Sequence, residues 1–312
     1  MARYIIRRLI YSAIILIIAA IVIFVMLHLA PGDVALAVVG NAALHPANVA
    51  QVRHELGLDR PVLFQLITYF HNIVTGNFGS SLISGQSIST IIQEYAGNTL
   101  ILALAAAVLT YVVAIPLGVL AAVHRNSIFD QAVMFLAVLG MGIPNFVLAI
   151  VLILFLAVNN HILPVSGSGD LKHLILPAFV LSAEAIAVIM RMMRSSMLEQ
   201  LGQDYIRNLH AKGLPRWRII WQHALRNALT PIISISAIQL RSFLGYTLIV
   251  EVIFRWPGLG FQLVDSILNR DYQVAEFLSL LLTAIVILFN TGADIAYAFA
   301  DPRIRRRSGA TR

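Results

Sequence analysis

The sequence predicts an all-α membrane protein with six transmembrane helices and both termini in the cytoplasm, and three observations carry this prediction. The 312-residue chain is 59% hydrophobic and only 12% charged, whereas an average soluble domain has about 25% charged residues. Six apolar runs approach or exceed the roughly 20 residues that a helix needs to cross the hydrocarbon of a bilayer. Basic residues lie at the ends of these runs, so the net charge of +7 does not indicate a nucleic-acid partner.

The six apolar runs are expected to be helical, because lipid offers no hydrogen-bond partner to exposed backbone groups. They cover residues 9–29, 100–123, 131–158, 173–190, 229–252 and 277–300. The first run is too long for the core of a signal peptide and is expected to be a retained helix. The third run is interrupted around Gly140, Gly142 and Pro144, and we interpret it as one kinked span. Two complete spans there would move the most basic loop of the chain to the outside.

The positions of the 22 lysines and arginines set the predicted orientation. Most of them lie near the N-terminus, in the loop of residues 191–226 and in the C-terminal tail, and basic ends of this kind mark the cytoplasmic side. The predicted organisation is a first helix with a cytoplasmic N-tail (1–29), an external loop or cap (30–98), a five-helix core (99–300) and a basic cytoplasmic tail (301–312). The external loop has amphipathic stretches around residues 49–56 and 62–73.

The loop of residues 191–226 has a helix–glycine–helix pattern. Gly213 is placed to end one short helix, and Pro215 suits the first turn of the next. Tyr205, Ile206 and Leu209 recur at helical spacing, so we expect a surface helix that exposes apolar side chains to the cytoplasm. Such a helix suits docking of a partner protein, whereas a generic basic loop would only anchor to anionic lipid. The pattern alone favours neither reading.

Motifs along the whole chain form a specific combination. The basic loop contains Lys212-Gly213, followed by His223-x-x-Arg226-Asn227-Ala228. The other motifs are Leu29-Ala30-Pro31-Gly32-Asp33, Leu56-Gly57-Leu58-Asp59-Arg60-Pro61, Gly76-Asn77-Phe78-Gly79, Val250 to Gly260, and Asp301-Pro302-Arg303. Together they resemble the permease subunits of type I ABC importers, in the branch that transports dipeptides, oligopeptides and nickel.

The resemblance implies a set of partners in a bacterial inner membrane. These are a second, similar permease, two cytoplasmic ATPases that bind ATP and Mg²⁺, and an extracytoplasmic substrate-binding protein. The chain contains no Gly-x-x-x-x-Gly-Lys-[Ser/Thr] sequence for holding ATP phosphates, so we expect a transport subunit without a cofactor of its own, not an enzyme. The resemblance assigns ATPase coupling to Gln203, Asp204, Tyr205, Ile206, Arg207, Leu209, His210, Ala211, Lys212 and Gly213.

Ionisable residues inside a bilayer are costly and normally face a cavity or a partner. Glu184 in the fourth span and Arg241 in the fifth are candidates for the substrate pathway, where Arg241 would attract a carboxylate and Glu184 an amine or a metal. The alternative is an ion pair that holds the two spans together. Asn290 and Asp294 share one face of the sixth span. We expect these two residues to have a structural role, either capping the helix end or pairing with another polar group.

Two segments are candidates for a gate or hinge: Gly140, Gly142 and Pro144 in the third span, and Trp256, Pro257 and Gly258 after the fifth. For the first segment, the alternative is close helix packing through small residues. For the second, the alternative is a tryptophan anchor at the membrane interface, and neighbouring Glu251 is a candidate to hold the turn.

The sequence predicts no metal site, because it has no cysteine and no two of its nine histidines have helical i, i+3 or i, i+4 spacing. Small peptides are the leading cargo, and nickel or a metal chelate is the alternative. An ion-driven secondary transporter would explain the intramembrane charges but not the helix–glycine–helix loop. An intramembrane serine protease is excluded, since the Gly-x-Ser-Gly motif and a histidine in the sixth span are both missing.

Overall fold

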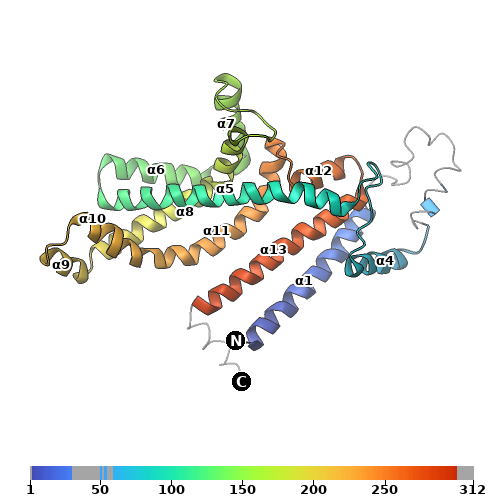
Figure 1. Ribbon diagram of the computed structural model, residues 1–312, viewed down its shortest axis with the longest axis horizontal. Coiled ribbons are helices and arrows are strands. Elements are labelled where there is room, and N and C mark those ends of the chain that lie inside the picture. The colour runs from blue at the N-terminus through green and yellow to red at the C-terminus, as the bar shows by residue number, and fades with distance from the viewer. Residues whose placement is uncertain (1, 30–49, 51–52, 55–58, 301–312) are drawn as a thin grey trace. The chain divides into compact units, whose positions relative to one another are not determined.

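A computed structural model describes residues 2–29, 50, 53–54 and 59–300, and these residues are almost entirely helical (Figure 1). The chain divides into two compact units. The first unit contains Met1–Asn98 and Pro257–Arg312, and the second contains Thr99–Trp256. The predicted tail (301–312) and most of the amphipathic stretch 49–56 lie outside the described residues.

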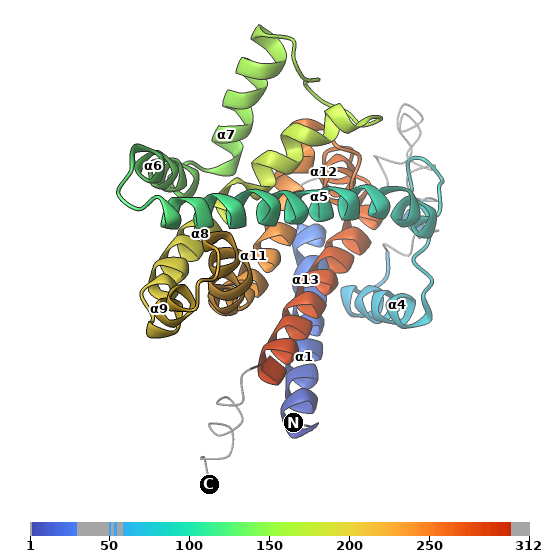
Figure 2. The same cartoon turned by 60° about the vertical axis from the view of Figure 1, so that its left-hand side comes forward.

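The first unit is built on the pairing of α1 (Ala2–Leu29) with α13 (Tyr272–Ala300), which lie side by side in Figures 1 and 2. Two polar contacts join the helices. Arg8 forms an ion pair with Asp294, and the hydroxyl oxygens of Ser12 and Thr291 are 2.6 Å apart. Apolar helices gain no hydrophobic driving force for association in lipid, because the lipid tails are equally apolar. Polar contacts such as these therefore determine which two helix faces meet. The predicted pairing role is confirmed for Asp294.

The amphipathic stretch predicted around residues 62–73 is the helix α4 (Val62–Thr75). Its buried residue Tyr69 packs against Phe24 of α1 and Phe277 of α13, with ring centroids 5.8 and 5.7 Å apart. The helix ends at Gly76, whose φ of +70° is a left-handed cap conformation that glycine adopts without strain. The unit is completed by the start of α5 (Ile88–Val123) and by α12 (Leu259–Leu268).

The second unit is organised around α8 (Leu171–Leu201), which packs against α6 (Ile128–Gly142), α7 (Asn145–Leu152) and α11 (Leu225–Phe254). In the most apolar stretch of 18 residues of α8, 67% is buried inside the protein, compared with 22% in the corresponding stretch of α5. The chain reaches α11 from α8 through α9 (Asp204–Ala211), α10 (Arg216–Arg218) and the π-helix η3 (Ile219–Ala224).

Small residues allow the helices of the second unit to approach closely. A Cβ atom added to Gly118 of α5 would lie 2.7 Å from both the carbonyl oxygen of Met190 and the Cβ of Met193. A Cβ added to Gly140 of α6 would lie 3.2 Å from the Cβ of Ala187. This close approach at Gly140 is consistent with the packing alternative, and its hinge role stays a prediction.

Four described helices are long and apolar enough to cross a membrane, namely Tyr4–Leu29, Ile88–Val123, Leu171–Leu201 and Tyr272–Gly292. Two bent helix pairs pass the same test together, and the described chain reaches the predicted six spans only if each pair is one span. One pair is α6 with α7 and the following π-helix η2 (Ile153–Asn159), and its two parts meet at 110°. This bend is much larger than the single kink that we expected. Pro144 explains it, because the residue before a proline is driven out of helical conformation, and Ile143 is extended with ψ of 119°.

Candidate functional site

The helix–glycine–helix prediction is confirmed for the loop that follows α8. The short helix α9 begins after Gln203 and ends at the C-cap Lys212. Gly213 follows with φ of +75°, and its N–H donates to the carbonyl oxygen of His210 at 2.9 Å. Pro215 precedes α10 as its N-cap, one residue before the first turn where we expected it. Figure 2 shows α9 beside the ends of α8 and α11.

The apolar stripe of α9 faces the protein and not the cytoplasm, which corrects the sequence prediction. Ile206 is buried in the hydrophobic core of the second unit, and Tyr205 and Leu209 pack against the same core. The Tyr205 hydroxyl donates to Gln200 of α8 at 3.0 Å and accepts from Asn227 of α11 at 3.1 Å. An amphipathic pattern indicates that one face of a helix is covered, but it does not indicate which surface covers that face. The apolar face of α9 is covered by neighbouring helices of the same chain.

The exposed face of α9 is polar. Its solvent-facing residues are Asp204, Arg207, Asn208, His210 and Ala211, with Gln203, Lys212 and Gly213 exposed at its two ends. Arg207 and Asp204 form a loose ion pair of 3.6 Å between side chains that are largely in solvent. Any partner that docks here therefore meets charges and hydrogen-bonding groups on a helix that three apolar residues hold to the core.

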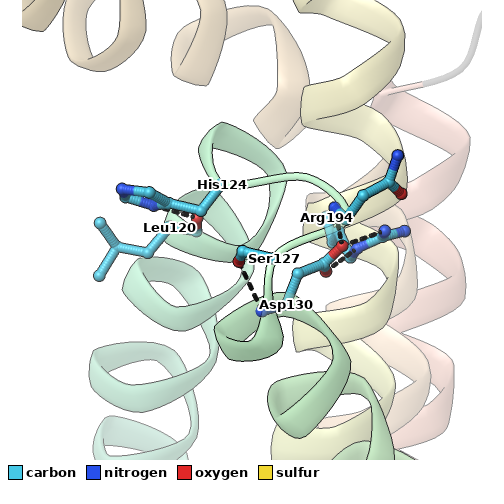
Figure 3. Close-up of polar contacts among 6 residues, drawn as sticks. Leu120, His124, Ser127, Asp130 and Arg194 are labelled. Atoms are coloured by element: carbon cyan, nitrogen blue, oxygen red, sulfur yellow. Dashed lines mark hydrogen bonds and ion pairs between the residues drawn. The ribbon is translucent and has the colours of Figure 1, made fainter.

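A buried ion pair lies near the loop and escaped the sequence analysis (Figure 3). Arg194 of α8 donates from Nε and Nη2 to the two carboxylate oxygens of Asp130, at 2.5 and 2.7 Å. Asp130 also accepts from the backbone N–H of Asn126 at 2.9 Å, and its own N–H donates to the hydroxyl of Ser127, the N-cap of α6. The Asp130 side chain is 3% exposed and that of Arg194 is 23% exposed. The Ser127-x-x-Asp130 pattern resembles a helix capping box, which marks the start of α6 but does not indicate the partner of Asp130.

The two intramembrane candidates Glu184 and Arg241 are not joined in the structure. Glu184 is half-buried on α8, whereas Arg241 is exposed on α11. Among the described residues, neither a hydrogen bond nor an ion pair links them, although α8 and α11 pack together. The predicted role of each in the substrate pathway stays a prediction.

The backbone of Glu251 caps the end of α11, and the predicted role of its side chain in holding the following turn stays a prediction. Glu251 is fully buried, and the Thr99 hydroxyl of α5 donates to its Oε1 at 2.7 Å. The helix ends at Arg255, and the backbone N–H of Trp256 donates to the Glu251 carbonyl oxygen at 2.9 Å. Trp256 is only 4% exposed and packs in a hydrophobic core, so it is not an interfacial anchor.

The remaining gate and hinge candidates differ in their surroundings. Pro257 accepts a hydrogen bond from the Asn98 side chain at 2.9 Å, and Gly258 is the N-cap of α12. A Cβ added to Gly142, next to the 110° bend, would meet no atom within 4 Å. In the described part of the chain, no three His, Cys, Asp or Glu side chains gather in a geometry that would hold a metal ion.

Comparison with known proteins identifies the family. Residues 114–306 match the model of the binding-protein-dependent transport system inner membrane component, and residues 1–89 match the model of its N-terminal part. The oligopeptide transport system permease protein AppB of Bacillus subtilis is 39% identical over 97% of this chain and 99% of its own length. The dipeptide transport system permease protein DppB of Escherichia coli K12 is 37% identical over 91% of this chain and 93% of its own length.

A solved structure supports the fold. A chain of the MetNI methionine ABC transporter, in an inward-facing conformation, matches with a TM-score of 0.53 at 21% identity. The match covers 67% of this chain and 95% of that one. The long apolar helices and this fold are those of a multi-pass membrane protein.

The chain belongs to the family of binding-protein-dependent transport system inner membrane components, and it is the permease subunit of a type I ABC importer in a bacterial inner membrane. Members of this family work with a substrate-binding protein and an ATPase, so the chain moves a solute and does not catalyse a reaction.

Proposed function

We propose that this permease carries small peptides and that α9 is the site where an ATPase subunit docks. The observation that carries the docking proposal is the geometry of α9. It is a short helix with a polar exposed face, tied at Tyr205 to both α8 and α11 and ended by a left-handed glycine. The relatives named above as oligopeptide and dipeptide permeases support the cargo, and nothing observed favours nickel or a metal chelate.

The contacts of α9 suggest how a docked ATPase would drive transport. Because Ile206 of α9 is buried in the same hydrophobic core as Met197 of α8 and Ile219 of η3, we expect a movement of α9 to displace these elements. Arg194 then passes the displacement of α8 to α6 through Asp130. The bend at Pro144 lets α6 shift without carrying α7 along the same axis. The resulting motion is a rigid-body rocking of packed helices, the usual mode of alternating access.

In the complete importer, we infer that a second, similar permease forms the other half of the pathway. Two ATPase subunits, carrying ATP and Mg²⁺, bind the coupling helices on the cytoplasmic side, where the basic loop and both termini lie. A substrate-binding protein delivers cargo to the external segment 30–98. Along the pathway Arg241 meets a peptide carboxylate and Glu184 a peptide amine, since these charges complement the two ends of a peptide.

The docking proposal is tested with the variant Gly213→Val in the reconstituted importer. A β-branched residue at φ of +75° costs about 1–2 kcal/mol, so the variant is expected to displace the end of α9. The expected result is normal insertion in the membrane with ATP hydrolysis that no longer drives uptake. Gly202→Val is the matched control, because Gly202 also follows a helix but has φ of −83°. Wild-type coupling in Gly213→Val would overturn the docking assignment.

The cargo is tested by uptake of a labelled dipeptide into proteoliposomes that contain the complete importer. ATP-dependent uptake that excess unlabelled peptide abolishes is expected. Uptake of a nickel chelate in place of the peptide would overturn the peptide assignment and leave the docking assignment standing. Uptake without ATP, driven by an ion gradient, would overturn both.

A further inference from the structure

A cavity lies beside the segment that leads from α9 back to the membrane-spanning helix α11. Its volume is about 260 Å³, and five aliphatic side chains form most of its wall: Val123, Leu201, Ile206, Ile219 and Ile220. The other described residues that line it are His210 and Arg216, so its described lining contains no carboxylate. The cavity therefore combines an apolar wall with a permanent cation, which suits a ligand that has an apolar chain and an anionic group.

Two tryptophans are exposed on the same segment. Trp217 of α10 is 55% exposed and Trp221 of η3 is 43% exposed, whereas Ile219 and Ile220 between them are buried. The guanidinium of Arg218 lies 5.3 Å from the centre of the Trp217 ring. Large indole rings are unfavourable in water, but together with arginines they are typical of the interface between membrane and water.

The last residues of two long apolar helices line this cavity, together with two residues of η3. Val123 is the last residue of α5, Leu201 is the last residue of α8, and η3 continues directly into α11. Lipid headgroups gather where spanning helices leave the hydrocarbon. Basic pockets between the ends of such helices are suited to anionic lipid. The position of the cavity thus selects a lipid from among amphiphilic anions.

We propose that this cavity binds an anionic phospholipid. Arg216 pairs with the phosphate, the aliphatic wall receives the upper part of an acyl chain, and Trp217 and Trp221 lie at the headgroup level. Because Ile206 and His210 belong to α9, the bound lipid contacts this helix together with α5, α8 and η3. The proposal depends on the membrane location of the chain and not on its cargo or its docking partner, so its failure would leave the proposed function untouched.

The test is quenching of tryptophan fluorescence by brominated lipid. The permease is placed, together with a partner permease whose own tryptophans are replaced by phenylalanine, in nanodiscs of phosphatidylcholine that contain either brominated phosphatidylglycerol or brominated phosphatidylcholine. The chain has three tryptophans, and the variant Trp256→Phe leaves only the two exposed ones. The expected result is about fivefold stronger association of the brominated anionic lipid, the effect of about 1 kcal/mol for one arginine near an anionic surface.

Two variants separate a site from a general attraction of basic residues. Arg216→Gln is expected to remove the preference and Arg216→Lys to retain most of it. Arg207→Gln, on the exposed face of α9 and outside the cavity lining, is expected to keep it. Equal quenching by both lipids, or an equal loss in Arg216→Gln and Arg207→Gln, would overturn the proposal. So would complete protection from both brominated lipids when the ATPase subunits are added, since the segment would then be a protein interface.

Discussion

The Asp130–Arg194 ion pair predicts a large and specific loss of stability when one partner is neutralised. In Asp130→Asn, the Arg194 guanidinium loses two charged hydrogen bonds of 2.5 and 2.7 Å in a site where the carboxylate is 3% exposed. Removing one partner of a buried pair costs about 3–5 kcal/mol. Because Arg194 is 23% exposed and water can partly solvate it, we expect about 3 kcal/mol, the lower end of that range.

The assay is thermal unfolding of the purified protein in detergent, followed by intrinsic fluorescence. Trp217, Trp221 and Trp256 all belong to the second unit, so the signal reports on the unit that contains the ion pair. A loss of about 3 kcal/mol corresponds to a decrease in Tm of about 6–12 °C for a unit of this size. Asp204→Asn is the matched control, because it breaks the exposed 3.6 Å pair with Arg207, and it should change stability by less than about 1 kcal/mol.

A double-mutant cycle completes the test. The variant Asp130→Asn with Arg194→Gln leaves no unpaired charge, so it is expected to be more stable than the sum of the two single effects predicts. If Asp130→Asn melts within the error of the wild type, or if the two effects simply add, the ion pair does not hold α6 to α8. The route proposed above from α9 to α6 would then be wrong.

Three further predictions concern packing, the pathway and pH. Gly118→Ala is expected to lower the free energy of unfolding by about 1–3 kcal/mol, because its Cβ would lie 2.7 Å from backbone and side-chain atoms of α8. Gly245→Ala, whose Cβ would meet no atom within 4 Å inside α11, should be neutral or stabilising by up to about 1 kcal/mol in the same melting assay. Arg241→Ala should reduce peptide uptake more than the yield of folded protein. The pathway role would be wrong, and the two residues would form a structural pair, if three variants reduce only the yield of folded protein: Arg241→Ala, Glu184→Ala and the double variant. In that case the double variant should be no worse than either single variant. The hydrogen bond from His173 lowers the pKa of Asp170, the N-cap of α8. The ionised cap therefore stabilises the folded state above the ordinary pKa of the carboxyl, and this stabilisation is lost as the pH falls through the lowered pKa. In thermal melts, the wild type should lose more stability in that acidic range than Asp170→Ala does.

Much of the local structure follows from the sequence by itself. Long apolar runs must be helical in lipid, so the positions of the apolar helices are decided by composition. Gly213 and Pro215 mark the end of one helix and the start of the next, because few other residues suit these backbone conformations. The motifs along the chain likewise point to its family, since they are short local patterns that do not depend on distant contacts.

Tertiary structure decided the features that depend on which surfaces meet. The spacing of Tyr205, Ile206 and Leu209 predicts an apolar face, but only the packing of α9 on the core shows that this face is covered within the chain. The sequence contains Asp130 and Arg194, yet nothing local indicates that residues 64 positions apart form a buried pair. Side-chain pairing across helices and the burial of each helical face depend on the relative rotation of packed helices, which a one-dimensional pattern does not encode.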